Sequence, residues 1–250
     1  MAYALSWDFY LDRLREDSDA FSVAARSGMG REVPSCPGWR VEQLVAHLTD
    51  VHYFWGQVAE KHYGDYKQVT PVEISRNPDP IARFEEEADR LIRVLEASNE
   101  DIPVWTWSWD KTIGFVKRRM AHETSVHRWD CESASSQAAP INETLAEDGV
   151  AEIADTFFPT SAGEAHHAEL GGDGSIVRLR CEPGRTWDVR LGAQVVETLG
   201  AEEAADPSAV ISGSPSDLVL LFWRRKSLDE VTVEGDRKAA EQLVGWLDLD

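Results

Sequence analysis

The sequence predicts an α+β protein in which an N-terminal four-helix bundle precedes a small mixed domain. Two observations support this fold class. Helical apolar spacing dominates the first half of the chain, whereas short alternating segments separated by glycine turns fill the second half. We therefore expect one domain over residues 1–137 and another over 138–250, with an SQAAPIN linker at 136–142. A chain of 250 residues is long enough for two such domains.

Charge and composition exclude several classes of protein. The formal charge of -20 gives a surface that repels phosphate backbones and anionic lipid, so we expect neither nucleic-acid nor membrane partners. The chain has no apolar run of about 18 residues, and its acidic N-terminus is unlike a signal peptide, which favours a cytoplasmic location. Without a heptad seam, we expect a monomer. The three widely spaced cysteines predict neither a disulfide nor a cysteine zinc cluster.

Four segments in the first half carry the apolar spacing of amphipathic helices. They cover residues 5–27, 41–61, 80–95 and 113–134. Asp79 supplies a capping oxygen to the third segment, and Pro80 suits its first turn. Seven of the ten tryptophans lie before residue 130, where core packing explains most of them and a ligand pocket explains the others.

The second half predicts short strands and helices. The GGDG and EPGR segments have the composition of hairpin turns. The predicted strands are residues 166–170, 175–181, 186–191, 209–212 and 230–234, and the predicted helices are 143–158, 216–225 and 237–247. Strands and helices in this mixture indicate a small α+β domain.

The fourth helical segment carries the residues that are able to bind a metal or take part in catalysis. Its inward stripe begins with apolar residues and then turns polar, in the order Val116, Met120, Glu123, His127 and Asp130 or Cys131. Glu123 and His127 are four residues apart, so their side chains meet on one helix face. A buried carboxylate needs a partner. Three alternatives fit this pattern. The carboxylate forms a polar network with Arg119 and His127, or it binds a metal ion with His127, or both residues lie at the surface and need no partner.

A third metal ligand is available in the second helical segment. His47 lies at the edge of its apolar face, and three protein ligands leave coordination positions open, as in catalytic sites. His52 and His122 are alternative ligands, although His122 points about 100° away from its neighbour Glu123. Asp50 and Asp130 could hydrogen-bond the histidine ligands.

Three segments resemble the mycothiol-dependent maleylpyruvate isomerase family, a branch of the DinB-like metal-binding bundles. They are residues 33–48, with CPGW and AHL, 118–130, with ExxxH, and 211–225, which begins ISGSPSD. The resemblance covers nearly the whole chain. It implies that His47, Glu123 and His127 bind a divalent metal, usually zinc, although this ligand set also suits nickel, manganese or iron. It also implies a sterol-carrier-like C-terminal domain that covers the metal cleft.

The same resemblance implies a catalytic arginine at Arg225. Arg224 stands where the family often has glycine, so either arginine could face the site, and both could instead favour a helix C-terminus electrostatically. Arg40 also departs from the family, which often places a capping Ser or Thr there.

The function that the resemblance implies is activation of a low-molecular-weight thiol, mycothiol, by a metal. The thiolate would add to a double bond of a small anionic substrate, allow rotation and leave, or it would be transferred to an electrophile. A metal-dependent hydrolase on the same bundle and a non-enzymatic ligand-binding protein are the alternatives. The chain lacks the glycine-rich motifs of nucleotide sites and the G-x-S-x-G motif of serine hydrolases.

Overall fold

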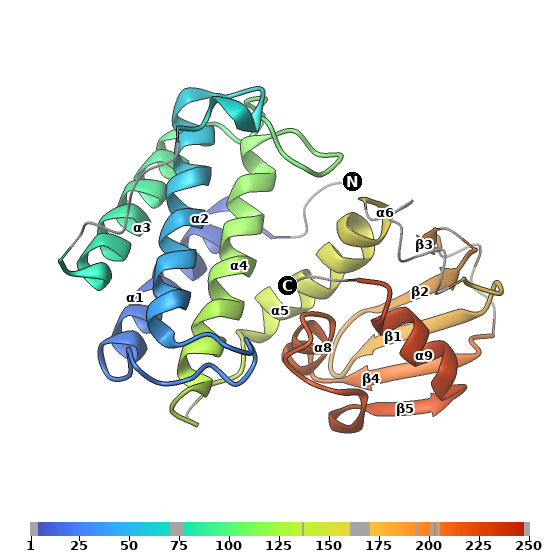
Figure 1. The fold of residues 1–250 in the computed structure, drawn as a ribbon. Coiled ribbons are helices and arrows are strands. Elements are labelled where there is room, and N and C mark those ends of the chain that lie inside the picture. The colour runs from blue at the N-terminus through green and yellow to red at the C-terminus, as the bar shows by residue number, and fades with distance from the viewer. Residues whose placement is uncertain are drawn as a thin grey trace. The chain divides into compact units, whose positions relative to one another are not determined.

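The computed structural model describes residues 5–70, 78–136, 138–160, 171–193, 195–200, 203 and 206–247. The chain forms two compact units, Met1–Ile141 and Asn142–Asp250 (Figure 1). The predicted fold class, a helical bundle followed by an α+β unit, is confirmed. None of the helices in these ranges is long and apolar enough to cross a membrane.

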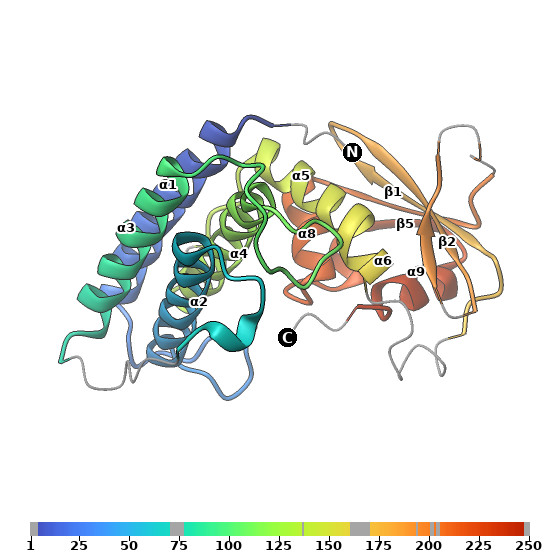
Figure 2. The same cartoon turned by 90° about the horizontal axis from the view of Figure 1, so that it is seen from above.

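The first unit contains the four predicted helices, which lie side by side in both views of the chain (Figures 1 and 2). Helix α1 packs against α3 and α4, and α2 packs against the same two helices. Their bounds are α1 Trp7–Arg26, α2 Val41–Lys61, α3 Pro80–Ala97 and α4 Ile113–Ser133, and a short 3-10 turn, η1, covers Tyr66–Gln68. All four helices agree with the predicted ranges to within two residues at each end.

Capping groups explain where three of these helices begin. The Ser6 hydroxyl accepts a hydrogen bond from a first-turn amide of α1, Asp79 accepts two at the start of α3, and Thr112 accepts one at the start of α4. Arg40, which precedes α2, has no acceptor in its side chain. Its own amide donates instead to Gln43 Oε1 at 2.8 Å, so α2 starts with half of a capping box.

The core of the bundle contains two apolar clusters along the helices. One gathers Leu14, Trp55, Leu91 and Phe115, and the other gathers Phe21, Leu44, Leu48 and Phe84, together with smaller residues. Trp55 stacks on Trp105 with ring centroids 5.8 Å apart, so core packing accounts for part of the high tryptophan content.

Helix α4 is buried on more sides than the single predicted stripe implies. Val116, Met120 and His127 are buried as predicted. The cationic side chains of Lys117, Arg118, Arg119 and Arg128 are buried on other faces too, and so is the His122 ring. Each such cation needs a partner, because burial removes its hydration. A helical wheel that locates the buried face from apolar residues cannot show the burial of these cations, because it assigns charged positions to the solvent-exposed face.

The second unit is built on a five-stranded sheet in the order β3-β2-β1-β4-β5. Strands β1 and β4 pair in parallel and the other neighbours pair antiparallel. Helix α9 lies along the sheet and contacts β1, β4 and β5 (Figure 2). The bounds are β1 Ile176–Cys181, β2 Thr186–Leu191, β3 Val196–Thr198, β4 Ala209–Gly213, β5 Thr232–Gly235, α5 Glu143–Glu152, α6 Phe158–Thr160, α8 Pro215–Phe222 and α9 Arg237–Val244.

Several details of this unit differ from the prediction. The structure adds the three-residue strand β3, which is too short to show an alternating pattern. The predicted helix over 143–158 changes to a π turn at Ile153–Phe157. The predicted helix over 216–225 ends at Phe222, because Arg224 adopts a left-handed backbone with φ 56°. The predicted strand at 166–170 lies outside the described residues.

Candidate metal centre

A turn at 33–40 leads into α2 and determines how the helix enters the site. The Val33 amide donates to the Trp39 carbonyl at 2.9 Å, and the Trp39 amide donates to the Cys36 carbonyl at 2.9 Å. Gly38 has φ +84°, a conformation that other residues rarely adopt. His47 follows in the second turn of α2 and remains 37% exposed at its side chain, so one of its sides is open to solvent.

The structure brings together the three predicted ligands, His47 from α2 with Glu123 and His127 from α4. Glu123 Oε1 lies 3.2 Å from His127 Nε2 and 3.7 Å from His47 Nε2. One donor atom from each of the three residues lies within 4.8 Å of the others. Two imidazoles and a carboxylate from different helices therefore converge on one point.

Glu123 takes part in an ion pair and faces the two histidines at the same time. Arg119 Nη2 donates to Oε2 at 2.6 Å, so the Arg119–Glu123–His127 network that the sequence left open is present. Burial would raise the pKa of Glu123, but Arg119 and the histidines outweigh it and hold this pKa well below the usual range. The group is therefore a carboxylate whose Oε1 faces the two imidazoles.

His127 is oriented by a second carboxylate. Its Nδ1 donates to Asp130 Oδ2 at 2.9 Å, which directs Nε2 toward Glu123. Burial alone would lower the pKa of His127, but the bonds to Asp130 and Glu123 raise it to about 9. In the metal-free protein the imidazole therefore carries a second proton on Nε2 at neutral pH, and a metal ion would replace that proton.

Asp130, one of the two aspartates considered from the sequence, has no exposed surface. Ser35 Oγ donates to its other oxygen, Oδ1, at 2.6 Å. No sequence pattern pointed to Ser35, because a serine between two prolines in a turn carries no periodic signal. Asp50, the other aspartate, is exposed and has no hydrogen bond to a histidine among the described residues.

The alternative histidines do not join the cluster. His52 Nε2 lies 2.9 Å from Thr124 Oγ1, and burial lowers the pKa of His52 to about 3, so its ring is neutral. Its Nδ1 is buried and finds no hydrogen-bond partner in the described part of the chain. His122 lies against the Tyr10 ring on α1, with centroids 6.3 Å apart, which agrees with its predicted direction away from Glu123.

The donor set fits a divalent metal ion. Zinc binds imidazole nitrogen and carboxylate oxygen at about 2.0–2.2 Å, so tetrahedral ligands lie roughly 3.3–3.6 Å from one another. The separations of Glu123 Oε1 from the two histidine nitrogens, 3.2 Å and 3.7 Å, lie close to either end of that range, and all three donor atoms lie within 4.8 Å of one another. Three protein ligands would leave at least one coordination position for a small molecule.

The two candidate arginines lie just beyond α8 in the second unit. Arg225 Nη1 donates to the Trp223 carbonyl at 2.7 Å, and its guanidinium lies 5.9 Å from the centre of the Trp223 ring. Arg224 donates through Nη2 to the Leu247 carbonyl at 2.8 Å. Of the two, Arg225 is the less exposed.

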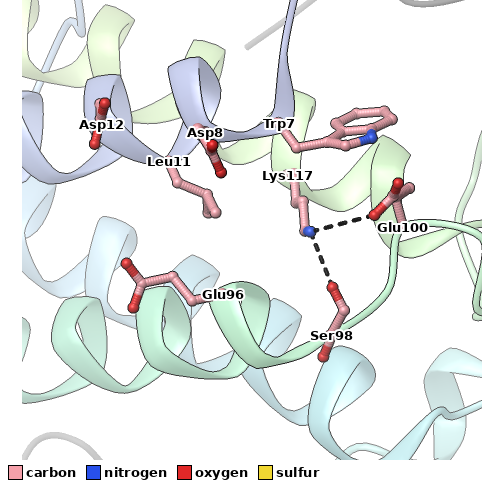
Figure 3. Close-up of a pocket in the computed structure, with 8 residues that line it drawn as sticks. All are labelled: Trp7, Asp8, Leu11, Asp12, Glu96, Ser98, Glu100 and Lys117. Atoms are coloured by element: carbon pink, nitrogen blue, oxygen red, sulfur yellow. Dashed lines mark hydrogen bonds and ion pairs between the residues drawn. The ribbon is translucent and has the colours of Figure 1, made fainter.

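A separate hollow of about 450 Å³ lies between α1, the end of α3 and the start of α4 (Figure 3). The ammonium of Lys117 donates to the Ser98 carbonyl at 2.9 Å and lies 4.0 Å from Glu100 Oε2. Burial lowers the pKa of Lys117, and Glu100 and Asp8 oppose that shift. Ser98 caps the C-terminus of α3, so Lys117 ties this helix end to α4.

Two family models match the chain. The mycothiol maleylpyruvate isomerase N-terminal domain matches residues 11–132, and the corresponding C-terminal domain matches residues 144–242. No curated protein matches the chain by sequence.

Two solved structures of one enzyme share its fold at low sequence identity. The crystal structure of the mycothiol-dependent maleylpyruvate isomerase is 19% identical, covers 92% of this chain and 93% of that chain, and superposes with a TM-score of 0.58. A histidine-to-alanine mutant of that enzyme is 18% identical over the same shares, with a TM-score of 0.60. A ubiquinone synthesis protein, UbiJ-SCP2, is 20% identical over 42% of this chain and 94% of that chain, with a TM-score of 0.32. With family matches to both halves, the chain belongs to the mycothiol-dependent maleylpyruvate isomerase family.

Proposed function

We propose that this protein is a metal-dependent enzyme that uses a low-molecular-weight thiol, mycothiol, to isomerise a small anionic substrate or to join that thiol through its sulfur to an electrophilic one. The observation that carries the proposal is the convergence of His47, Glu123 and His127 donor atoms within 4.8 Å of one another, in a chain of this family. The crystallised relative is by its name a mycothiol-dependent maleylpyruvate isomerase, which favours isomerisation of maleylpyruvate or a similar acid.

His47, Glu123 and His127 would hold the metal, and zinc suits their donor atoms best. When bound, such an ion lowers the pKa of a coordinated thiol, so that the nucleophile is a thiolate at neutral pH. Arg119 keeps Glu123 ionised and holds Oε2, which leaves Oε1 for the site. Asp130 retains the Nδ1 proton of His127 and so makes Nε2 the ligating atom. The exposed side of His47 gives a small thiol access.

Arg225 is the residue that we propose to act on the substrate. A guanidinium is always charged and matches the geometry of a carboxylate, so it would bind an anionic substrate or stabilise the enolate that forms when a thiolate adds to a conjugated double bond. This assignment rests on the family pattern around residues 211–225. We further propose that the domain at 138–250 covers the metal cleft, and that the protein is a cytoplasmic monomer.

The test begins with metal content, measured by plasma mass spectrometry on protein purified without chelator or His tag. We expect about one divalent ion per chain. His47→Ala should abolish binding, whereas His62→Asn, at the exposed and left-handed C-cap of the same helix, should keep the metal. Turnover of maleylpyruvate is then measured with mycothiol added or withheld.

Turnover that requires both metal and thiol would support the proposal. Metal-dependent turnover of esters or amides without thiol would identify the hydrolase instead. A metal content near zero that persists after reconstitution with zinc would overturn both enzymatic functions and leave a ligand-binding protein of this fold.

A further inference from the structure

We propose that the turn at 33–40, which supplies no metal ligand itself, positions both histidines of the metal centre. Within this turn, Ser35 acts on His127 through the buried carboxylate of Asp130. Ser35 is a positioning residue in this proposal, because its hydroxyl donates to Asp130 and acts on the metal-binding atoms only through that carboxylate. The inference rests on the proposed metal site and assigns a role to a segment that the reaction itself does not use.

The first support is the chain of contacts from Ser35 to His127. Ser35 Oγ donates to Asp130 Oδ1 at 2.6 Å, and His127 Nδ1 donates to Asp130 Oδ2 at 2.9 Å. The Cys36 sulfur lies 3.9 Å from the same Oδ2. Asp130 has no exposed surface, so water does not compete for its oxygens. A carboxylate held at both oxygens cannot rotate freely, and it therefore fixes the plane of the imidazole that it binds.

The second support is the stiffness of the turn that carries Ser35. Hydrogen bonds join the Val33 amide to the Trp39 carbonyl at 2.9 Å and the Cys36 amide to the Val33 carbonyl at 3.1 Å, so Ser35 lies inside a closed loop. Gly38 provides the φ of +84° that this loop needs. The serine hydroxyl is thus presented to Asp130 by a rigid backbone and loses little conformational freedom when it donates.

The third support is that the same turn contacts the other histidine ligand. The Trp39 ring lies against the His47 ring, with centroids 5.4 Å apart and planes inclined by 65°. The two histidine rings are themselves 5.0 Å apart. One short segment therefore contacts His47 directly and reaches His127 through Asp130. Outer partners of this kind typically change metal affinity by about 10- to 100-fold when they are removed.

The experiment compares Ser35→Ala with Ser133→Ala in the full chain. Ser133 Oγ donates to the backbone carbonyl of Asp130 at 2.7 Å, so this control removes a serine hydroxyl that bonds the same residue but not its carboxylate. Zinc affinity is measured by competition with a chromogenic chelator. We expect Ser35→Ala to weaken zinc binding about 2- to 10-fold, the range for one lost hydrogen bond. Ser133→Ala should bind zinc as the unaltered protein does.

A spectroscopic measurement separates positioning from a general loss of structure. Cobalt(II) replaces zinc at His/Glu sites, and its visible absorption depends on the geometry and basicity of the ligands. The cobalt spectrum should change in Ser35→Ala and change further in Asp130→Asn, with zinc affinity reduced about 10- to 100-fold in the latter. The spectrum of Ser133→Ala should match that of the unaltered protein.

The outcomes distinguish this inference from the proposed function. If the unaltered protein binds zinc and Ser35→Ala equals Ser133→Ala in both affinity and cobalt spectrum, the positioning role is wrong and the metal site stands. If the unaltered protein binds neither metal, the proposed function fails and the inference fails with it.

Discussion

The two halves of helix α4 both bury charged side chains, but they use them differently. Near its start, the Lys117 ammonium donates to a carbonyl at the end of α3 and faces one carboxylate. Two turns later, Glu123 faces two imidazoles as well as an arginine. In the first arrangement, the buried Lys117 ammonium is paired with oxygen acceptors. The second brings three metal-binding groups of two kinds to one point. Burial of charge alone therefore does not indicate a reactive site, whereas convergence of unlike donors from two helices does.

A hollow lined by charged side chains does not by itself indicate a reactive site. The hollow of about 450 Å³ beside Lys117 is lined by Asp8, Asp12, Glu96 and Glu100, and an arginine at position 15 pairs with two of these carboxylates. Lys117 faces the other two, Glu100 and Asp8. The metal half of α4 is recognised by donor atoms of Glu123 and His127 that converge with His47.

The largest expected effect comes from Glu123→Ala. Since the loss of an outer partner already costs about 10- to 100-fold in metal affinity, the loss of a ligand should reduce it by more than about 100-fold. Metal content per chain is the measurement. Glu132→Ala is the matched control, because Glu132 pairs with Arg128 at the same four-residue spacing. Metal loss in both variants would mean that α4 merely unfolds locally.

Lys117→Met should destabilise the protein while leaving the metal half intact. The change removes a charged hydrogen bond to the Ser98 carbonyl, which is worth about 1.5–3 kcal/mol, and keeps an apolar stem of similar length. Urea denaturation measures the loss, and chelator competition measures zinc affinity. A drop in zinc affinity without a drop in stability would contradict the division of α4 into two independent halves.

His52, which lies on α2 and contacts Thr124 on α4, tests whether a buried histidine outside the metal centre stays neutral. Its pKa is about 3 in the folded chain and 6.5 when unperturbed, so below pH 6.5 the unfolded chain binds a proton that the folded chain does not. Folding stability therefore falls by about 1.4 kcal/mol per pH unit from pH 6.5 toward 3, and this effect is absent above 6.5.

Urea unfolding of the metal-free protein between pH 7 and pH 5 measures this slope. His52→Gln keeps a polar group near Thr124 and does not titrate. Its free energy of unfolding should therefore fall less steeply with decreasing pH, by about 1.4 kcal/mol per pH unit. Equal slopes in the two proteins would show that His52 gains a proton in the folded state.

The smallest effect is expected from Thr112→Ala at the start of α4. The threonine hydroxyl accepts from the Phe115 amide at 3.3 Å, and such a cap contributes about 1 kcal/mol. Thermal unfolding should show this loss, with zinc affinity unchanged because Glu123 lies three helical turns further along. A parallel change in zinc affinity would mean that fraying at the cap propagates to the ligands.

The sequence predicted the bundle well because its helices combine clear apolar spacing with cap signals. Asp79 and Pro80 marked the start of α3, and the four-residue spacing of Glu123 and His127 implied that they share a face. Convergence with His47 was not derivable from spacing, because it depends on how α2 and α4 pack. That pairing came from the resemblance to the family.

Other features could not be predicted from the sequence, because they depend on contacts between distant parts of the chain. Burial of Lys117 and Arg119 depends on partners on other turns or helices, and periodicity assigns such residues to solvent. Ser35 reaches Asp130 across 95 positions of sequence, so no local pattern connects them. Strand β3 has only three residues, and its existence depends on the neighbouring strand β2 more than on its own composition.

The parallel pairing of β1 with β4 has a consequence for synthesis of the chain. Strand β1 pairs at one edge with the next strand, β2, but its other edge must wait for Ala209–Gly213. The helical unit is complete in sequence well before that point. On the ribosome, the bundle can therefore form first while one edge of β1 stays open. Unpaired edges invite association with other chains, so a nascent chain halted before residue 209 should be the form most prone to aggregate.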